Sequence, residues 1–170
     1  MRSGRSFISN GPMLEFTVES ASSGETLKLP GKKEVRLQAQ AFAQTPLDRL
    51  ELIRDGRVVA EGRSSADKLS FKLDHTLPME RSGWLAVRTS GPPVAALTVG
   101  RQVAHANPVH VEVAGTGQDS KADAEYFLAW IARLEADAAR RDRLHTGRSH
   151  VEMQFGIART VYAELARGRR

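Results

Sequence analysis

The feature that most constrains the fold is a change in the period of the hydrophobic pattern partway along the chain. From Met13 to about Val113, apolar and polar residues alternate, as in the stretch EVRLQAQAFA. Period two is typical of strands with one buried face. After AGTGQDS (114–120) the apolar residues recur at helical spacing. The chain is therefore predicted to have a β-rich part followed by a helical part.

Turn signals divide the β-rich part into short strands. Asp55-Gly56 lies between two apolar runs, which predicts a two-residue hairpin turn of type I′. Many short strands with frequent turns and no helical crossovers predict a mainly β fold with α, an immunoglobulin-like antiparallel β-sandwich followed by a C-terminal helical hairpin. A barrel remains an alternative. Trp84 is expected in the core between the two sheets.

The helical part is predicted to form two antiparallel helices. Ser120 is the expected N-cap of the first, and a capping box, Ser149 with Glu152, is expected to start the second. The favoured interpretation is that the hairpin packs on itself and on the sandwich, and the alternative is a docking surface for another domain or a second chain. The candidate interaction surface consists of Tyr126, Phe127, Trp130, Ile131, Phe155 and Tyr162.

Composition limits the classes of function. The net charge is +5, but Arg and Lys are interleaved with Asp and Glu, which favours a solvated surface over nucleic-acid contact. Cysteine is absent, so disulfides play no part. No apolar run is long enough to span a bilayer, so no membrane partner is predicted. The chain as written is expected to be cytoplasmic, an expectation that lapses if an upstream leader is missing.

No catalytic constellation is recognisable. The five histidines have neither the i, i+4 nor the His-x-His spacing of common metal sites. His145 and His150 flank the loop between the helices and are the best pair, for which surface or capping roles are expected. There is no G-x-S-x-G motif and no phosphate loop. We therefore predict no catalytic, metal-binding or cofactor-binding residue and no cofactor, and the chain alone is not expected to be an enzyme.

Several stretches resemble a known family. GRSFISNGPMLEFTVE at the start is similar to the segment that leads out of the catalytic barrel in the carbaryl-hydrolase-like (CehA/McbA) branch of the PHP metallohydrolases. The resemblance to the C-terminal β-rich region of these enzymes continues through LDRLELIRDGRVVAEG, RSGWLAVRTSG, AHANPVHVEV and DAEYFLAWIARLEADAARRDR. It therefore extends over nearly the whole chain.

The resemblance implies a particular organisation. Residues 1–12 would be a leader from a missing upstream domain, 13–116 the β-sandwich, and 117–170 the helical hairpin packed on it. The His and Asp metal ligands of the family begin with a D-x-H-x-H-type motif and reside in the barrel, and none of that barrel is in this sequence. Asn10-Gly11-Pro12 is then expected to be a structural turn that follows the missing domain.

The sequence is compatible with two functions. The first is a non-catalytic accessory domain of a PHP-type metal-dependent hydrolase, with the upstream catalytic domain as its partner in cis or in trans and a homo-oligomer as a further option. The second is a free-standing immunoglobulin-like binding module for protein or glycan, which would use exposed loops and edges around Trp84, Pro92 and Pro93.

Overall fold

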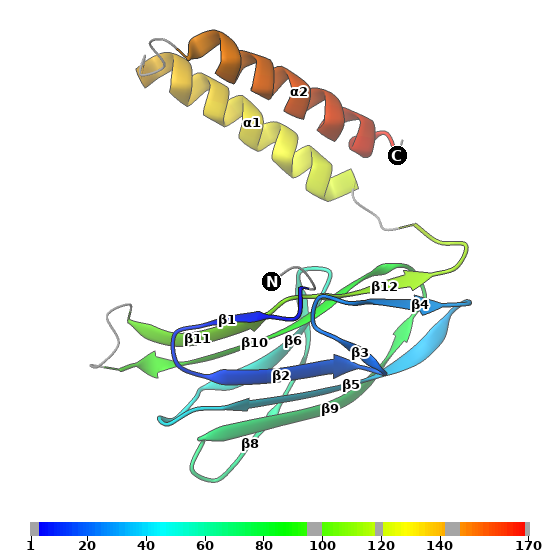
Figure 1. The fold of residues 1–170 in the computed structure, drawn as a ribbon, viewed down its shortest axis with the longest axis vertical. Coiled ribbons are helices and arrows are strands. Elements are labelled where there is room, and N and C mark those ends of the chain that lie inside the picture. The colour runs from blue at the N-terminus through cyan, green and yellow to red at the C-terminus, as the bar shows by residue number, and fades with distance from the viewer. Residues whose placement is uncertain (1–3, 95–99, 118–120, 142–146, 169–170) are drawn as a thin grey trace. The chain divides into compact units, whose positions relative to one another are not determined.

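The computed structural model describes residues 4–94, 100–117, 121–141 and 147–168. The chain divides into two compact units, Met1–Gln118 and Asp119–Arg170. The first unit contains all the described strands and the second contains both helices (Figure 1). The predicted fold class, a β-sandwich followed by a helical hairpin, is confirmed.

One sheet of the sandwich has five strands, all paired antiparallel. Its order is β3-β2-β5-β9-β8, so the two long strands β5 and β9 lie at its centre. In β5 every second residue is buried, as the period of the sequence predicts. The strands are β2 (Met13–Val18), β3 (Ala21–Ser22), β5 (Lys33–Phe42), β8 (Arg63–Ser64) and β9 (Ser70–Met79).

The other sheet has seven strands arranged around β10. Strand β10 pairs with β6, β11 and β12 along different stretches, and β12 makes the one parallel pair among the described strands, with β4. The strands are β1 (Phe7–Ser9), β4 (Thr26–Leu29), β6 (Arg49–Arg54), β7 (Arg57–Glu61), β10 (Gly83–Pro93), β11 (Arg101–Ala106) and β12 (Val109–Val113).

The hairpin turn between β6 and β7 matches its prediction. Arg54 pairs with Arg57, and the two residues between them have positive φ, 47° at Asp55 and 83° at Gly56. The Asp55 turn also contacts the neighbouring strand, because Trp84 N donates to Asp55 Oδ1 at 2.9 Å and Asp55 N donates to Trp84 O at 3.1 Å. This double contact fixes the register of β10.

The prediction for Trp84 is wrong. Leu85 and Val87 are fully buried in the core between the sheets, whereas Trp84 is half-buried and is not part of that core. Successive side chains of a strand point to opposite faces, so the register that places Leu85 inside places Trp84 outside.

The helical unit is a pair of antiparallel helices, α1 (Lys121–Arg141) and α2 (Arg148–Ala166). The Phe127 and Tyr162 rings stack with centroids 5.0 Å apart, and Glu135 pairs with Arg159 farther along α1. The predicted capping box is wrong, because α2 has Gly147 at its N-cap with no side-chain cap, and Ser149 lies inside the first turn. Ser120 lies outside the described residues. Neither helix has the length and apolar character that crossing a membrane requires.

Candidate interaction surfaces

An N-terminal clasp joins the first described residues to two distant loops. We use this name for Gly4–Pro12, Ser22–Glu25 and His105–Val109. Strand β1 pairs with β11, and Asn10 continues this pairing with its side chain. Asn10 Nδ2 donates to Arg101 O at 2.8 Å, and Asn10 Oδ1 accepts from Val103 N at 2.7 Å. The amide group of Asn10 thus serves as one more rung of the β ladder.

The start of the clasp is held by Asn107 and by a close backbone approach. Asn107 Nδ2 donates to Gly4 O at 2.8 Å and to Ser6 Oγ at 3.1 Å. Gly24 has a φ of 81°, and a Cβ placed on it would lie 2.2 Å from Gly4 C and O. Because no side chain fits there, glycine is required at position 24.

An ion pair completes the clasp. Arg5 contacts Glu25 at 2.5 Å, and Ser22 N donates to the same carboxylate at 2.8 Å. The Ser22 N–H, and after it the Arg5 guanidinium, holds the pKa of Glu25 below its ordinary value. The clasp is therefore bonded through backbone, amide and charged groups at once.

The sequence predicts that residues 1–12 are a leader from an upstream domain, and the clasp bears on this prediction. Over its described part this segment is built into the sandwich, since Phe7–Ser9 is a strand of the seven-stranded sheet. Ser9 Oγ accepts from Gly11 N at 2.9 Å and donates to Pro12 O at 2.5 Å, so Asn10-Gly11-Pro12 forms a side-chain-stabilised turn. Two of the stretches on which the family resemblance depends, GRSFISNGPMLEFTVE and AHANPVHVEV, meet at this clasp.

The six predicted hairpin residues do not form one surface. Ile131 is 7% exposed, and Phe155 and Tyr162 are half-buried. Tyr126, Phe127 and Trp130 are 58%, 40% and 47% exposed. Phe127 stacks on Tyr162 of α2, while Tyr126 and Trp130 contact each other edge to face with centroids 5.7 Å apart. Ile131, Phe155 and Tyr162 are thus mainly hairpin core, and Tyr126 and Trp130 are available for contact.

The prediction omitted part of the exposed apolar surface of the hairpin. On α1, Leu134 is exposed one turn after Trp130. On α2, three exposed residues recur at a spacing of four, and this spacing was the signal that could have revealed them. We define the hairpin stripes as Tyr126, Phe127, Trp130 and Leu134 on α1, and Met153, Ile157 and Val161 on α2.

A shallow hollow lies on the α1 stripe. It has a volume of about 270 Å³ and is lined by Tyr126, Ala129, Trp130 and Arg133. The small side chain of Ala129 leaves space beside the two aromatic rings, which lie one helical turn apart and contact each other edge to face. An apolar side chain of a partner could enter this hollow beside the Arg133 guanidinium.

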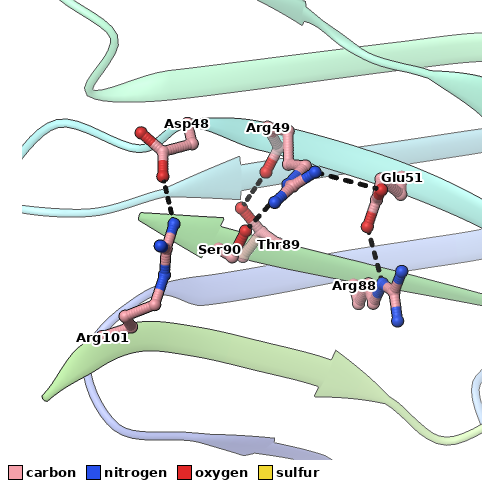
Figure 2. A network of polar contacts seen from close by, with 7 residues as sticks. All are labelled: Asp48, Arg49, Glu51, Arg88, Thr89, Ser90 and Arg101. Atoms are coloured by element: carbon pink, nitrogen blue, oxygen red, sulfur yellow. Dashed lines mark hydrogen bonds and ion pairs between the residues drawn. The ribbon is translucent and has the colours of Figure 1, made fainter. Parts of the chain in front are cut away.

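A polar network ties together strands β6, β10 and β11 (Figure 2). Glu51, which is 7% exposed, accepts from Arg88 Nε at 2.6 Å and lies 3.8 Å from Arg49. Arg101 pairs with Asp48 at 2.7 Å. Two more hydrogen bonds link β6 to β10: Thr89 Oγ1 donates to Arg49 O at 2.6 Å, and Arg49 Nε donates to Ser90 Oγ at 3.1 Å. All three arginines have carboxylate partners, so the network stabilises the sheet more than it offers cations to a polyanion.

The described histidines are dispersed. His75 is half-buried on β9, and His105 Nδ1 lies 2.8 Å from the neighbouring carbonyl of Ala106. His110 is exposed on β12, and His150 is exposed at the start of α2. His145 lies outside the described residues. Within residues 4–94, 100–117, 121–141 and 147–168, no group of three or more His, Cys, Asp and Glu side chains is placed to hold a metal ion.

Comparison with known proteins adds little to this description. No family model and no curated protein matches the chain. Among solved structures, it is similar to a chain from the fibronectin(III)-like modules of CbhA from Clostridium thermocellum. That likeness has 19% sequence identity and a TM-score of 0.34, and covers 58% of this chain and 96% of that chain. The two sheets and their shared core define the class of this molecule, a two-sheet β-sandwich, which is followed in the chain by a helical hairpin.

Proposed function

We propose that the chain is a non-catalytic accessory domain of a PHP-type metal-dependent hydrolase and acts through packing and interaction. The parent enzyme is proposed from a resemblance. The N-terminal, central and helical stretches of the chain are similar to the C-terminal region of CehA/McbA-like enzymes. The metal-dependent chemistry would then belong to the catalytic domain, in cis or in trans. The role of this chain would be to bind that domain and stabilise it.

The observation that carries the proposal is the pair of hairpin stripes. Seven large apolar side chains on two helices are between 40% and 58% exposed. Clustered exposed apolar surface is typical of protein–protein contact sites, and aromatic residues in small hollows often dominate the binding free energy. Trp130, beside the hollow on α1, is the residue expected to contribute most.

The test is a titration of the purified chain with the catalytic barrel of a CehA/McbA-like hydrolase from the same organism, followed by calorimetry. We expect a saturable complex, and Trp130→Ala is expected to weaken it about tenfold or more, as a hot-spot truncation does. Val161→Ala on the α2 stripe should weaken it less. Val58→Ala on the sandwich is the matched control, because Val58 and Val161 are 44% and 49% exposed.

Two results would contradict the proposal. One is the absence of any complex at concentrations where such domains associate. The other is a complex whose affinity depends equally on Val58 and Val161, since the hairpin stripes would then have no special part in it.

A second candidate function is a free-standing binding module. This hypothesis requires Trp84, Pro92 and Pro93 to be exposed. Pro92 and Pro93 are exposed, whereas Trp84 is half-buried. The specific observation in its favour lies elsewhere on the sandwich, in a polar depression over strands β2, β5 and β9.

A further inference from the structure

A concave depression lies over the five-stranded sheet. Its volume is about 690 Å³, and its lining comes from β2, β5 and β9 together with the segment around β7 and β8. Small-ligand sites commonly have volumes of about 300–1,000 Å³. The depression is therefore large enough for a ligand of two or three sugar rings or a comparable molecule.

The register of the strands places polar side chains in rows across this depression. Glu15 pairs with Gln40, Gln40 with Lys72, and Lys72 with Arg63, so one row crosses four strands. A second row runs through Thr17, Gln38 and Asp74. Neighbouring strands are about 4.8 Å apart, so the polar groups of one row are closely and regularly spaced.

Most of these polar groups are not used by the protein. Asp74 is occupied, since Arg36 Nε and Nη2 donate to it at 2.8 and 2.5 Å. In the part of the chain that the structure describes, no side-chain hydrogen bond or ion pair is made by six other lining residues, Glu15, Thr17, Gln40, Glu61, Arg63 and Lys72. Their donors and acceptors face solvent around a single depression.

The charges of these six residues define the ligand. Two carboxylates, Glu15 and Glu61, are matched by two cations, Arg63 and Lys72. An anionic ligand would need an excess of cations, and a metal ion would need a cluster of carboxylates, which the described residues do not supply. Gln40 and Thr17 both donate and accept hydrogen bonds. A neutral molecule with many hydroxyl groups satisfies this balanced set.

We propose that the depression over β2, β5 and β9 is a binding site for neutral saccharides. The affinity is weak, with a Kd of roughly a millimolar, because no exposed aromatic ring lines the site and the ring of Phe16 belongs to the buried core. The site is distinct from the hairpin stripes, so the saccharide proposal does not depend on the accessory function and either can fail alone.

The experiment is an NMR titration of the whole chain, in which backbone amide shifts are followed. The neutral probes are maltotriose and cellotriose, the anionic probe is trigalacturonic acid, and the cationic probe is chitosan trimer. We expect saturable shifts with at least one neutral probe, confined to β2, β5, β9 and the segment around β7 and β8. No shift with either neutral probe at tens of millimolar overturns the proposal, as does an equal or stronger response to a charged probe.

Matched variants test the assigned residues. Gln40→Ala should weaken binding about fivefold or more, because it removes a donor and an acceptor from the row. Gln44→Ala is the control, since Gln44 is exposed and lies outside the depression. Lys72→Met, which retains an unbranched side chain, provides a second variant if Gln40→Ala unfolds. If both variants fold and bind the neutral saccharide with unchanged affinity, the assignment of the site to this depression is wrong.

Discussion

The sandwich and the hairpin bury their apolar side chains to very different degrees. In the sandwich, Leu37, Leu50, Leu52 and Leu85 are all fully buried. In the hairpin, the buried residues are Ala124 and Ile131 of α1, and none of the described residues of α2 is buried. The two units have similar shares of large apolar residues available, but the sandwich uses them between its sheets and the hairpin leaves them exposed.

This difference in burial indicates which unit has a stable core of its own. Burial of apolar area contributes about 25 cal/mol per Å², and most of the stability of a helix in a protein comes from tertiary packing of its apolar face. The sandwich therefore has its own source of stability. The described helices bury few of their own apolar side chains, and covering the hairpin stripes would add to the stability of the hairpin. Contact with a partner is thus thermodynamically coupled to the order of the hairpin.

The largest expected effect is on the free energy of unfolding, and it should differ between the two units. Leu85→Ala should lower the free energy of unfolding of the sandwich by about 3–4 kcal/mol, because it leaves a cavity between the sheets. Ile131→Ala should leave this transition nearly unchanged and act on the helical signal alone. Denaturation is followed by hydrogen exchange at the strand amides of the sandwich for the first transition and by circular dichroism of the helices for the second. Equal effects of the two variants on a single transition would show that the units unfold as one.

The second prediction concerns the clasp. Gly24→Ala should destabilise the sandwich by about 1–3 kcal/mol, because the new Cβ meets the Gly4 backbone and position 24 has a positive φ. Hydrogen exchange at the amides of β1 and Asn107 should become faster. Gly31→Ala is the control, since nothing lies within 4 Å of a Cβ at Gly31. A neutral result at Gly24 would mean that the clasp adds little to the sandwich.

The sequence predicts the β fold well where its signal is local. Period two defines the strands, and Asp55-Gly56 predicts the β6–β7 turn because two adjacent residues determine it. Trp84 was misplaced because both faces of β10 are apolar, with Trp84 and Ala86 on one and Leu85 and Val87 on the other. A one-residue choice of register reverses the faces, and the pattern alone gives no preference.

The candidate surfaces were less predictable. The apolar stripe of α1 spans more than one helical face, so its pattern does not separate Ile131, which is buried, from Trp130, which is exposed. The clasp depends on contacts such as Asn10 with Val103 and Gly4 with Gly24, which are distant in sequence. Nothing in the spacing of these residues indicates that they meet, and they could be recognised only once the sheets were assembled.

A smaller effect is expected in the hairpin. Gly156 lies inside α2, and nothing lies within 4 Å of a Cβ there. Gly156→Ala should stabilise the helical unit by about 0.5–1 kcal/mol, because alanine loses less backbone entropy in a helix. Thermal melting of the helical signal measures this. Gly147→Ala, at the N-cap, should give no comparable gain. If Gly156→Ala also stabilises the sandwich, the two units are coupled.

The smallest effect is a pH dependence of the clasp. The pKa of Glu25 is held below 4.5, first by the Ser22 N–H and then by Arg5. A carboxyl group with a lowered pKa in the folded state adds stability above its unfolded pKa, and this contribution is lost as pH falls through the folded value. The clasp should therefore loosen below about pH 4.5, seen as a loss of protection of the Ser6 and Asn107 amides relative to their intrinsic exchange rates at each pH. Glu25→Gln should remove this dependence. Arg5→Ala should retain part of the lowering, because the Ser22 N–H still donates to the carboxylate. A fully ordinary Glu25 pKa in Arg5→Ala would instead make the ion pair the main tie between the clasp and the sandwich.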